Sequence, residues 1–179
     1  MSRSTRRLAL LVPILFANIL LSTGARAAEV VRLPLVNSDF PISAAVIIPA
    51  GYATVFVSGA LPELVDKGAP KGSVQAYGDM ETQTVSVLTQ IEATLARMGL
   101  GLGDVVKMTV FMAADPTQGN KLNFTGLMAG YTRFFGTADQ PNKPARSAVQ
   151  VAALVSPGAL LEIEVIAAKP PVPAKKGTQ

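Results

Sequence analysis

The chain has 179 residues, 49% of them apolar, and a formal net charge of +4 at pH 7. It contains no cysteine and no histidine, which excludes disulfides, thiolate nucleophiles, imidazole bases and the usual zinc sites. Any catalysis would rest on carboxylates, arginine, lysine, tyrosine, hydroxyl groups and the backbone, and the sequence suggests neither a metal site nor a cofactor.

Residues 1–27 have the pattern of a secretory signal peptide. A basic segment over residues 3–7 precedes an apolar run over residues 8–21, and residues 25–27 read Ala-Arg-Ala, the small-x-small form of a cleavage site. We expect a periplasmic or secreted protein with no stable membrane insertion after signal cleavage. A retained membrane anchor is the alternative, although the run is short for a span of about 20 residues.

Signal removal would also change the charge. Four of the 16 basic residues and none of the 12 acidic residues lie in residues 1–27, so 12 of each remain and the formal net charge becomes zero. A nucleic-acid surface needs a basic field to hold phosphates. No nucleic-acid partner is therefore expected.

The first part of the mature chain predicts β structure. Residues 30–36 are apolar and β-prone, and residues 46–48 and 54–57 are two β-branched runs separated by Pro49 and Gly51. Two such runs with proline and glycine between them predict a hairpin.

Two helices with a strand between them come next. The first helix is expected over about residues 77–98, where apolar residues recur at spacings of three and four before Gly99. Its stripe consists of Val85, Leu88, Ile91, Leu95 and Met98. Residues 105–113 are apolar almost throughout, as in a central strand covered on both faces. The second helix is expected over about residues 121–135, before Gly136.

Two strands close the domain. Residues 145–149 and 161–167 are expected to form a hairpin, and residues 169–179 are expected to be a disordered tail. The order ββαβαββ over residues 28–168 predicts an α+β domain with two helices packed on one face of a mixed β-sheet. The other face would stay apolar and exposed, which predicts a homo-oligomer.

The closing strands carry the best candidates for a reactive site. Arg146 begins the first, and Glu162 and Glu164 share one face of the second because strand side chains alternate. A guanidinium can hold a carboxylate through two parallel hydrogen bonds, and a glutamate can accept a proton from water. One of the glutamates could instead be structural, paired with Lys107 or with Arg146 itself.

These residues belong to a wider pattern over residues 35–168. The motifs are, in order, Val57-Ser58-Gly59 with Pro62, residues 95–99 (Leu-Ala-Arg-Met-Gly), residues 104–111 (Asp-Val-Val-Lys-Met-Thr-Val-Phe), Asp115, Tyr131 with Phe134-Phe135, residues 144–149 (Pro-Ala-Arg-Ser-Ala-Val) and residues 161–167 (Leu-Glu-Ile-Glu-Val-Ile-Ala). In these motifs the chain resembles the RidA (YjgF-like) family of enamine/imine deaminases. The resemblance implies a chorismate-mutase-like fold, a homotrimer with sites in clefts between subunits, and hydrolysis of reactive 2-imino acids to 2-keto acids and ammonia.

The resemblance also implies roles for four residues. On the family pattern, Arg146 binds the substrate carboxylate and Glu162 positions the attacking water. Backbone groups near Gly59 and Ala148 would border the ligand. Imine hydrolysis requires no histidine, cysteine or metal ion, which agrees with the composition.

Three positions depart from the family pattern. Ile42 replaces the tyrosine of a Pro-Tyr-Ser motif, Met128 replaces an asparagine, and Ala148 replaces a frequent cysteine. The less polar pocket is expected to favour imino acids with bulkier or more apolar side chains. A non-catalytic trimeric module of the same fold, binding small carboxylates or serving interaction, is the alternative to an enzyme.

Overall fold

The computed structural model describes residues 28–172. Its elements in chain order are β1 (Val31–Pro34), β2 (Ser43–Ile47), β3 (Ala53–Ala60), α1 (Val74–Tyr77), α2 (Met80–Ala96), β4 (Val105–Met112), α3 (Phe124–Tyr131), β5 (Ala145–Gln150) and β6 (Leu161–Lys169). The predicted signal peptide of residues 1–27 lies outside the described residues, as do residues 173–179 of the predicted tail. Three strands therefore precede the first helix.

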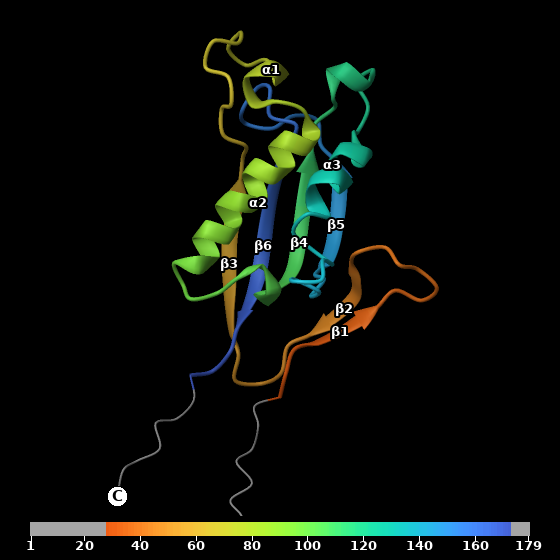
Figure 1. The fold of residues 1–179 in the computed structure, drawn as a ribbon, viewed down its shortest axis with the longest axis vertical. Coiled ribbons are helices and arrows are strands. Elements are labelled where there is room, and N and C mark those ends of the chain that lie inside the picture. Colours follow the sequence, from red (N-terminus) through yellow and green to blue (C-terminus); the bar gives the residue numbers. More distant parts are fainter. Residues whose placement is uncertain (1–27, 173–179) are drawn as a thin grey trace, which may run out of the picture.

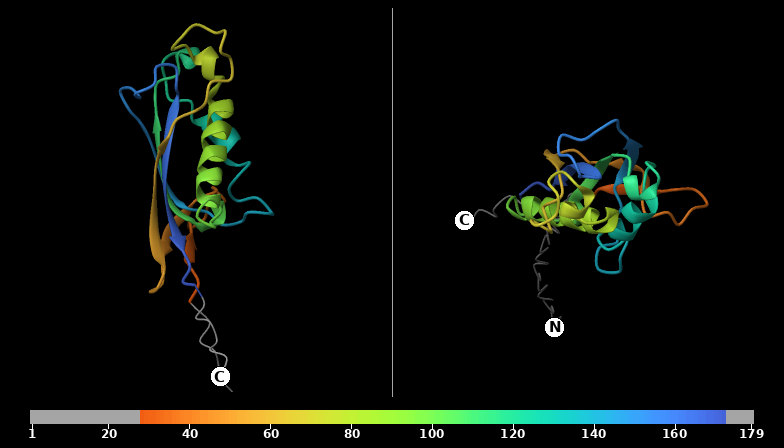
Figure 2. Two further views of the ribbon diagram at one scale, coloured as in Figure 1. Left: turned by 90° about the vertical axis from the view of Figure 1, so that its left-hand side faces the viewer. Right: turned by 90° about the horizontal axis from the view of Figure 1, so that it is seen from above.

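The strands form a mixed sheet in the order β1-β2-β5-β4-β6-β3. Helices α2 and α3 lie across one face of this sheet (Figure 1), and the edge-on view in Figure 2 shows no helix against the other face within the described residues. This arrangement confirms the predicted α+β class. We call the covered side the helix face and the other side the open face.

Two predicted hairpins are wrong. Strand β2 pairs with β1 and β5, whereas β3 pairs with β6, so residues 46–48 and 54–57 are not partners. Strands β5 and β6 are also not adjacent, because β4 lies between them, parallel to β5 and antiparallel to β6. The apolar β4 takes the centre of the sheet, and pairing rules based only on chain neighbours do not capture such an insertion.

The first predicted helix, over about residues 77–98, is α2 in the structure, and only Tyr77 of that range belongs to the short helix α1. Gly78 separates α1 from α2 with a positive φ of 81°, a backbone conformation that glycine adopts at little cost. Asp79 then caps α2 by accepting a hydrogen bond from the Thr82 backbone N–H at 2.8 Å. At the far end Gly99 has a φ of 71°, and the amide of the next residue donates back to the Leu95 carbonyl at 3.0 Å.

Helices α2 and α3 approach each other through glycines. A Cβ on Gly130 would lie 2.6 Å from the Thr84 Cβ, and one on Gly126 would lie 2.7 Å from the Met80 Cβ. Real Cβ atoms do not come this close to carbon neighbours, so these two positions require glycine for the observed packing. The close contact holds α3 over β4 and β5, where the candidate site lies.

The two faces of the sheet differ sharply in burial. On the helix face, Met108, Val110 and Met112 of β4 and Leu161, Ile163 and Val165 of β6 are all buried. On the open face, Phe56 is 77% exposed and Val149 is 46% exposed. Strand β4 is central, as predicted, but helices cover it on one face only. No helix within residues 28–172 is long and apolar enough to cross a membrane.

Candidate functional site

Arg146 lies on the helix face, beneath α3. It is the second residue of β5 and pairs with the buried Met108 of β4. Its guanidinium carbon lies 4.2 Å from the centroid of the Tyr131 ring, 5.5 Å from that of Phe40 and 5.7 Å from that of Phe124. These distances are within the range of cation–π attraction, so three aromatic rings hold the charged group in place.

The hydrogen-bonding capacity of Arg146 is mostly unused. Its Nη2 donates to the thioether sulfur of Met128 at 3.3 Å, and its Nη1 is shielded from solvent and has no hydrogen-bond partner. The structure records no ion pair between Arg146 and a carboxylate of residues 28–172. Burial lowers the pKa of Arg146, opposed by the Tyr131 hydroxyl, yet a guanidinium stays protonated at neutral pH. A shielded, unpaired cation is costly, and an anionic ligand would relieve that cost.

The aromatic residues are placed by contacts with the start of the chain. The Tyr131 hydroxyl donates to the Pro41 carbonyl at 2.8 Å, and burial raises the pKa of this tyrosine. The Ser43 amide donates to the Pro144 carbonyl at 2.9 Å. These bonds tie the segment before β2 to α3 and to the start of β5, so that Phe40 reaches Arg146.

A buried carboxylate fixes the start of α3. Asp115 accepts hydrogen bonds from the Thr117 hydroxyl at 2.6 Å and from the Asn123 side-chain amide at 2.9 Å. Asn123 in turn caps α3 by accepting from the Gly126 amide at 3.0 Å. Burial acts to raise the pKa of Asp115, but its hydrogen bonds outweigh burial and lower it overall. This network sets the position of Phe124, the first residue of the helix.

Glu162 lies on the open face. It pairs with Phe111 of β4, and its side chain folds over Gly59 at the irregular part of β3. A Cβ on Gly59 would collide with the Glu162 carboxylate and would lie 2.8 Å from its Cδ. Glycine at position 59 therefore makes room for the carboxylate, and these two predicted site residues are neighbours.

The four predicted site residues thus form two separate groups. Arg146 and Ala148 lie on the helix face of β5, whereas Gly59 and Glu162 lie on the open face at β3 and β6. The interpretation of Arg146 and Glu162 as a close pair on one hairpin is wrong within a single chain. Pairing with β4 explains the result, because Arg146 is aligned with Met108 and Glu162 with Phe111, an odd number of residues apart.

The predicted structural partners of the glutamates are also different. Lys107 donates to the Ser147 hydroxyl at 2.9 Å rather than to a glutamate. Glu164 is exposed on the same face as Glu162, as strand alternation predicted. Neither glutamate forms an ion pair with a described lysine or arginine. Glu164 therefore offers a carboxylate matched to Glu162 in strand and face, but without the glycine beneath it.

Sequence reasoning missed the aromatic surroundings of Arg146. Phe40 and Phe124 stack on each other, with ring centroids 6.1 Å apart and planes at 16°. Their positions in the sequence could have indicated them, because Phe40 directly precedes the altered Pro-Ile-Ser motif and Phe124 lies one helical turn before Met128. Both side chains remain partly exposed, Phe124 by 36%.

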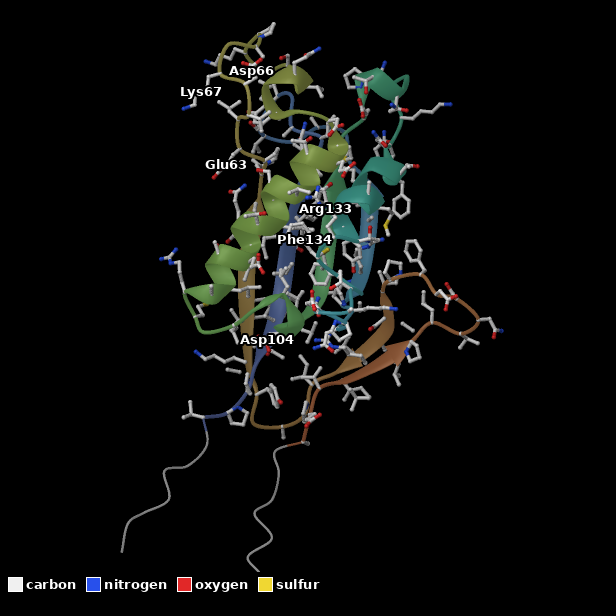
Figure 3. The ribbon with its side chains drawn as sticks, viewed as in Figure 1. Glu63, Asp66, Lys67, Asp104, Arg133 and Phe134 are labelled. Atoms are coloured by element: carbon white, nitrogen blue, oxygen red, sulfur yellow. The ribbon has the colours of Figure 1, made fainter. Side chains whose placement is uncertain are left out.

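Other polar groups lie away from this region. Glu63, Asp66 and Lys67 project into solvent from the loop after β3, and Asp104 lies beside the start of β4 (Figure 3).

A hollow of about 600 Å³ lies beyond the carboxyl ends of β4 and β5, between residues 72–75, 113–117 and 152–160. Within residues 28–172 there is no group of three or more carboxylates that could hold a metal ion.

Comparisons with known proteins agree on one family. Residues 38–169 match the family model described as endoribonuclease L-PSP. A RutC family protein of Pyrococcus horikoshii is 37% identical over 115 residues, which cover 64% of this chain and 79% of that protein. TdcF of Escherichia coli, which is named as a candidate reactive intermediate deaminase, is 35% identical over 115 residues, covering 64% and 78%.

Solved structures share the fold. The crystal structure of Escherichia coli TdcF with bound serine has a TM-score of 0.51 and 32% identity, covering 68% of this chain and 84% of that chain. A Yersinia pestis protein of unknown function from the conserved Rid family has a TM-score of 0.57, covering 78% of this chain and 96% of that one. Its identity is 23%, so it supports the fold alone.

Proposed function

This chain belongs to the endoribonuclease L-PSP family, also called the RidA or YjgF family, and on that premise we propose that it hydrolyses reactive 2-imino acids to 2-keto acids and ammonia. The observation that carries the proposal is Arg146. Its guanidinium is held by aromatic rings, and its Nη1 is shielded and unpartnered. Such a group is suited to bind the small carboxylate that every 2-imino acid carries.

In the proposed reaction, Arg146 holds the substrate carboxylate while water attacks the C=N carbon. Glu162 of the partner subunit accepts a proton from that water as the new C–O bond forms. The imine nitrogen takes up that proton and then the proton of the new hydroxyl group, so that the C–N bond breaks as the C=O bond of the 2-keto acid forms and ammonia leaves. Imines hydrolyse readily, so positioning of the water and the imine supplies most of the acceleration.

We propose a homotrimer in which each site lies between two subunits. Arg146 and Glu162 point away from opposite faces of one sheet, so one small molecule cannot contact both within a chain. A second copy can bring its open face, with Glu162 and Gly59, toward the Arg146 side of the first. Association would also cover Phe56 and Val149, which are exposed in the single chain. Sedimentation of a stable monomer at micromolar concentration would contradict this assembly.

Ribonuclease activity, which the family description names, has less support in this chain. The part after residue 27 has 12 basic and 12 acidic residues and no formal net charge. Binding of RNA depends largely on a basic surface that neutralises phosphates. The groups that contact Arg146 are instead three aromatic rings and the thioether of Met128, which suits a small carboxylate with an apolar substituent.

A non-catalytic binding module is the second candidate. Ile42, Met128 and Ala148, which stand where the family has polar or reactive groups, pack against the hydrophobic core, and Met128 also contacts Arg146, so Glu162 would be the main polar side chain left for catalysis. This observation favours retained carboxylate binding without turnover. The two candidates therefore agree on the ligand group and differ on the reaction.

The deciding experiment follows imine loss directly. An amino-acid oxidase generates the imine, semicarbazide traps it, and the purified protein without residues 1–27 competes with the trap. We expect faster imine loss, abolished in Arg146→Ala and in Glu162→Gln but retained in the matched control Glu164→Gln. No acceleration with any amino acid, together with measurable 2-keto acid binding, would establish the module and overturn the enzyme.

We also propose that the chain is exported and that residues 1–27 are removed. The support is the basic segment, the apolar run and the Ala-Arg-Ala sequence at residues 25–27. Mass spectrometry of the native protein should find an N-terminus at Ala28. A chain that retains residues 8–21 in the membrane fraction would support the anchored form instead.

A further inference from the structure

We infer that the Arg146 site selects 2-imino acids with a large apolar side chain, aromatic rings above all, and that Phe40 and Phe124 form the recognising surface. The inference rests on the proposed function, because it assigns a substrate class to the same site. The sequence predicted only a preference for bulkier or more apolar side chains. The inference adds which residues recognise the side chain and that a flat aromatic group is preferred.

The first step is the position of the ligand's carboxylate. The Nη1 of Arg146 has no hydrogen-bond partner but is shielded from solvent, so the carboxylate can attach there only after a covering side chain moves. The rings of Phe40 and Phe124 have their centroids 5.5 and 5.7 Å from the guanidinium carbon. In a 2-imino acid the side chain begins two bonds from the carboxylate carbon. A ligand held by Arg146 therefore carries its side chain to the level of these two rings.

The second step is the character of the ring surface. Phe40 and Phe124 are nearly parallel, with planes at 16°, and both are only partly buried. Phe124 keeps 36% of its surface exposed. An exposed aromatic pair beside an unpaired cation combines an anion-binding group with an apolar wall. A ligand with a carboxylate and a flat apolar group matches both features.

The third step is the lack of polar alternatives. The three positions that depart from the family pattern, Ile42, Met128 and Ala148, pack against the hydrophobic core. The Tyr131 hydroxyl is already committed to the Pro41 carbonyl. A hydroxyl or amide on the ligand side chain would lose water without gaining a partner from these residues. Small side chains, such as that of the alanine-derived imine, would leave the rings in water.

The expected selectivity is measurable. Differences of one or a few apolar groups in a pocket commonly change specificity by about 10- to 200-fold. We expect phenylpyruvate to bind at least about 10-fold more tightly than pyruvate, and 4-methyl-2-oxopentanoate to lie between them. The imines derived from phenylalanine, leucine and alanine should show the same order in kcat/KM.

The experiment measures binding and turnover separately. The three 2-keto acids are titrated calorimetrically into the protein without residues 1–27, and the three imines are compared in the semicarbazide assay. Phe124→Leu keeps an apolar side chain but removes the flat ring, and Phe40→Ala removes the second ring from a loop. Leu64→Ala is the control, because Leu64 is a half-exposed apolar residue in the loop after β3.

The outcomes separate this inference from the proposed function. Tight phenylpyruvate binding that weakens toward the pyruvate value in Phe124→Leu and Phe40→Ala, but not in Leu64→Ala, supports the inference even if no imine is turned over. Turnover with equal binding of pyruvate and phenylpyruvate overturns the inference and leaves the enzyme standing. Failure of all three acids to bind overturns the inference, and if imine loss is also not accelerated it overturns the proposed function as well.

Discussion

The helix face and the open face of the sheet are built from the same strands, yet within the described part of one chain only the helix face is covered by other elements. On the helix face, α2 and α3 bury the side chains of β4 and β6, and even Arg146 is enclosed by aromatic rings. On the open face, Phe56 and Val149 remain exposed, and Glu162 lies over a glycine and is only partly buried.

This difference separates two kinds of constraint. Away from Arg146 and the rings around it, a substitution on the helix face should alter folding, because the chain itself supplies the packing there. A substitution on the open face should alter assembly or reaction, because the fold does not depend on that surface. The contacts of Gly59 with Glu162 on the open face and of Gly130 with Thr84 on the helix face allow the two kinds of constraint to be tested.

The largest expected effect comes from dividing the proposed site between two inactive variants. Arg146→Ala and Glu162→Gln should each lower kcat/KM by a factor of about 100 or more, since each removes a group that acts on the substrate. When equal amounts are unfolded and reassembled together, about a quarter of the sites in a randomly mixed symmetric oligomer receive both intact residues. The semicarbazide assay should then recover about a quarter of the wild-type activity.

The mixing experiment has a direct control. Equal amounts of Glu162→Gln and the double variant Arg146→Ala/Glu162→Gln contain no intact glutamate and should stay inactive. If the first mixture also stays inactive while size measurements show mixed oligomers, the two faces do not share a site between subunits.

A smaller effect is expected from Gly59→Ala on the open face. The new Cβ would collide with the Glu162 carboxylate, so that side chain must turn away. We expect kcat/KM to fall by about 10-fold or more, because a misplaced catalytic group loses much of its effect. The free energy of unfolding should stay within about 0.5 kcal/mol of wild type, as for surface substitutions generally.

The control for Gly59→Ala is Gly101→Ala. A Cβ at Gly101 would meet nothing within 4 Å, and its φ of −132° suits any residue. Both activity and stability should match wild type in this variant. A loss of stability in Gly59→Ala comparable to its loss of activity would contradict the assignment of Gly59 to the reacting surface.

On the helix face, Gly130→Ala should have the opposite profile. Its Cβ would lie 2.6 Å from the Thr84 Cβ and 3.0 Å from the Glu81 carbonyl oxygen, so α2 and α3 must separate. Overpacking of this kind typically costs about 1–3 kcal/mol. Alanine's higher helix propensity, worth about 1 kcal/mol, offsets only part of this.

The measurement is urea unfolding at a fixed protein concentration, because association makes stability depend on concentration. Gly130→Ala should unfold at lower urea than wild type, and Gly101→Ala should not. Equal stability of Gly130→Ala and wild type would show that the helix face is less tightly constrained than the contact with Thr84 implies.

Local sequence patterns predicted the positions of most helices and strands, whereas the order of the strands in the sheet depends on pairing between distant segments. Spacings of two and of three to four residues located the strands and most of α2 and α3, because these periods are properties of a single segment. They did not predict that β4 separates β5 from β6. That pairing decides the faces of Arg146 and Glu162, because a shift of one residue moves a side chain to the other face.

The candidate site followed the same division. The family motifs indicated Arg146 and Glu162 as residues, but not that they lie on opposite faces of one chain. The glycine under Glu162 was predicted only as a border of the ligand, and its contact with the carboxylate needed the β3–β6 pairing. Phe40 came from an irregular segment, where no periodicity applies, and only tertiary bonds place it.

The smallest expected effect concerns pH and belongs to the helix face. Hydrogen bonds outweigh burial and lower the pKa of Asp115, so in the folded state it binds its proton less tightly than in the unfolded chain, where the pKa is about 3.9. Its contribution to stability is therefore complete above that unfolded value and is lost as pH falls through the lower, folded pKa. Asp79 adds to the same trend, because the hydrogen bond from the Thr82 amide lowers its pKa.

Urea unfolding at pH 6 and pH 3 should show a fall in stability for wild type and a smaller fall for Asp115→Asn, which cannot change its charge. Since both carboxylates lie at helix starts, the fall should be retained in Glu162→Gln, and its disappearance there would assign the pH dependence to the open face instead.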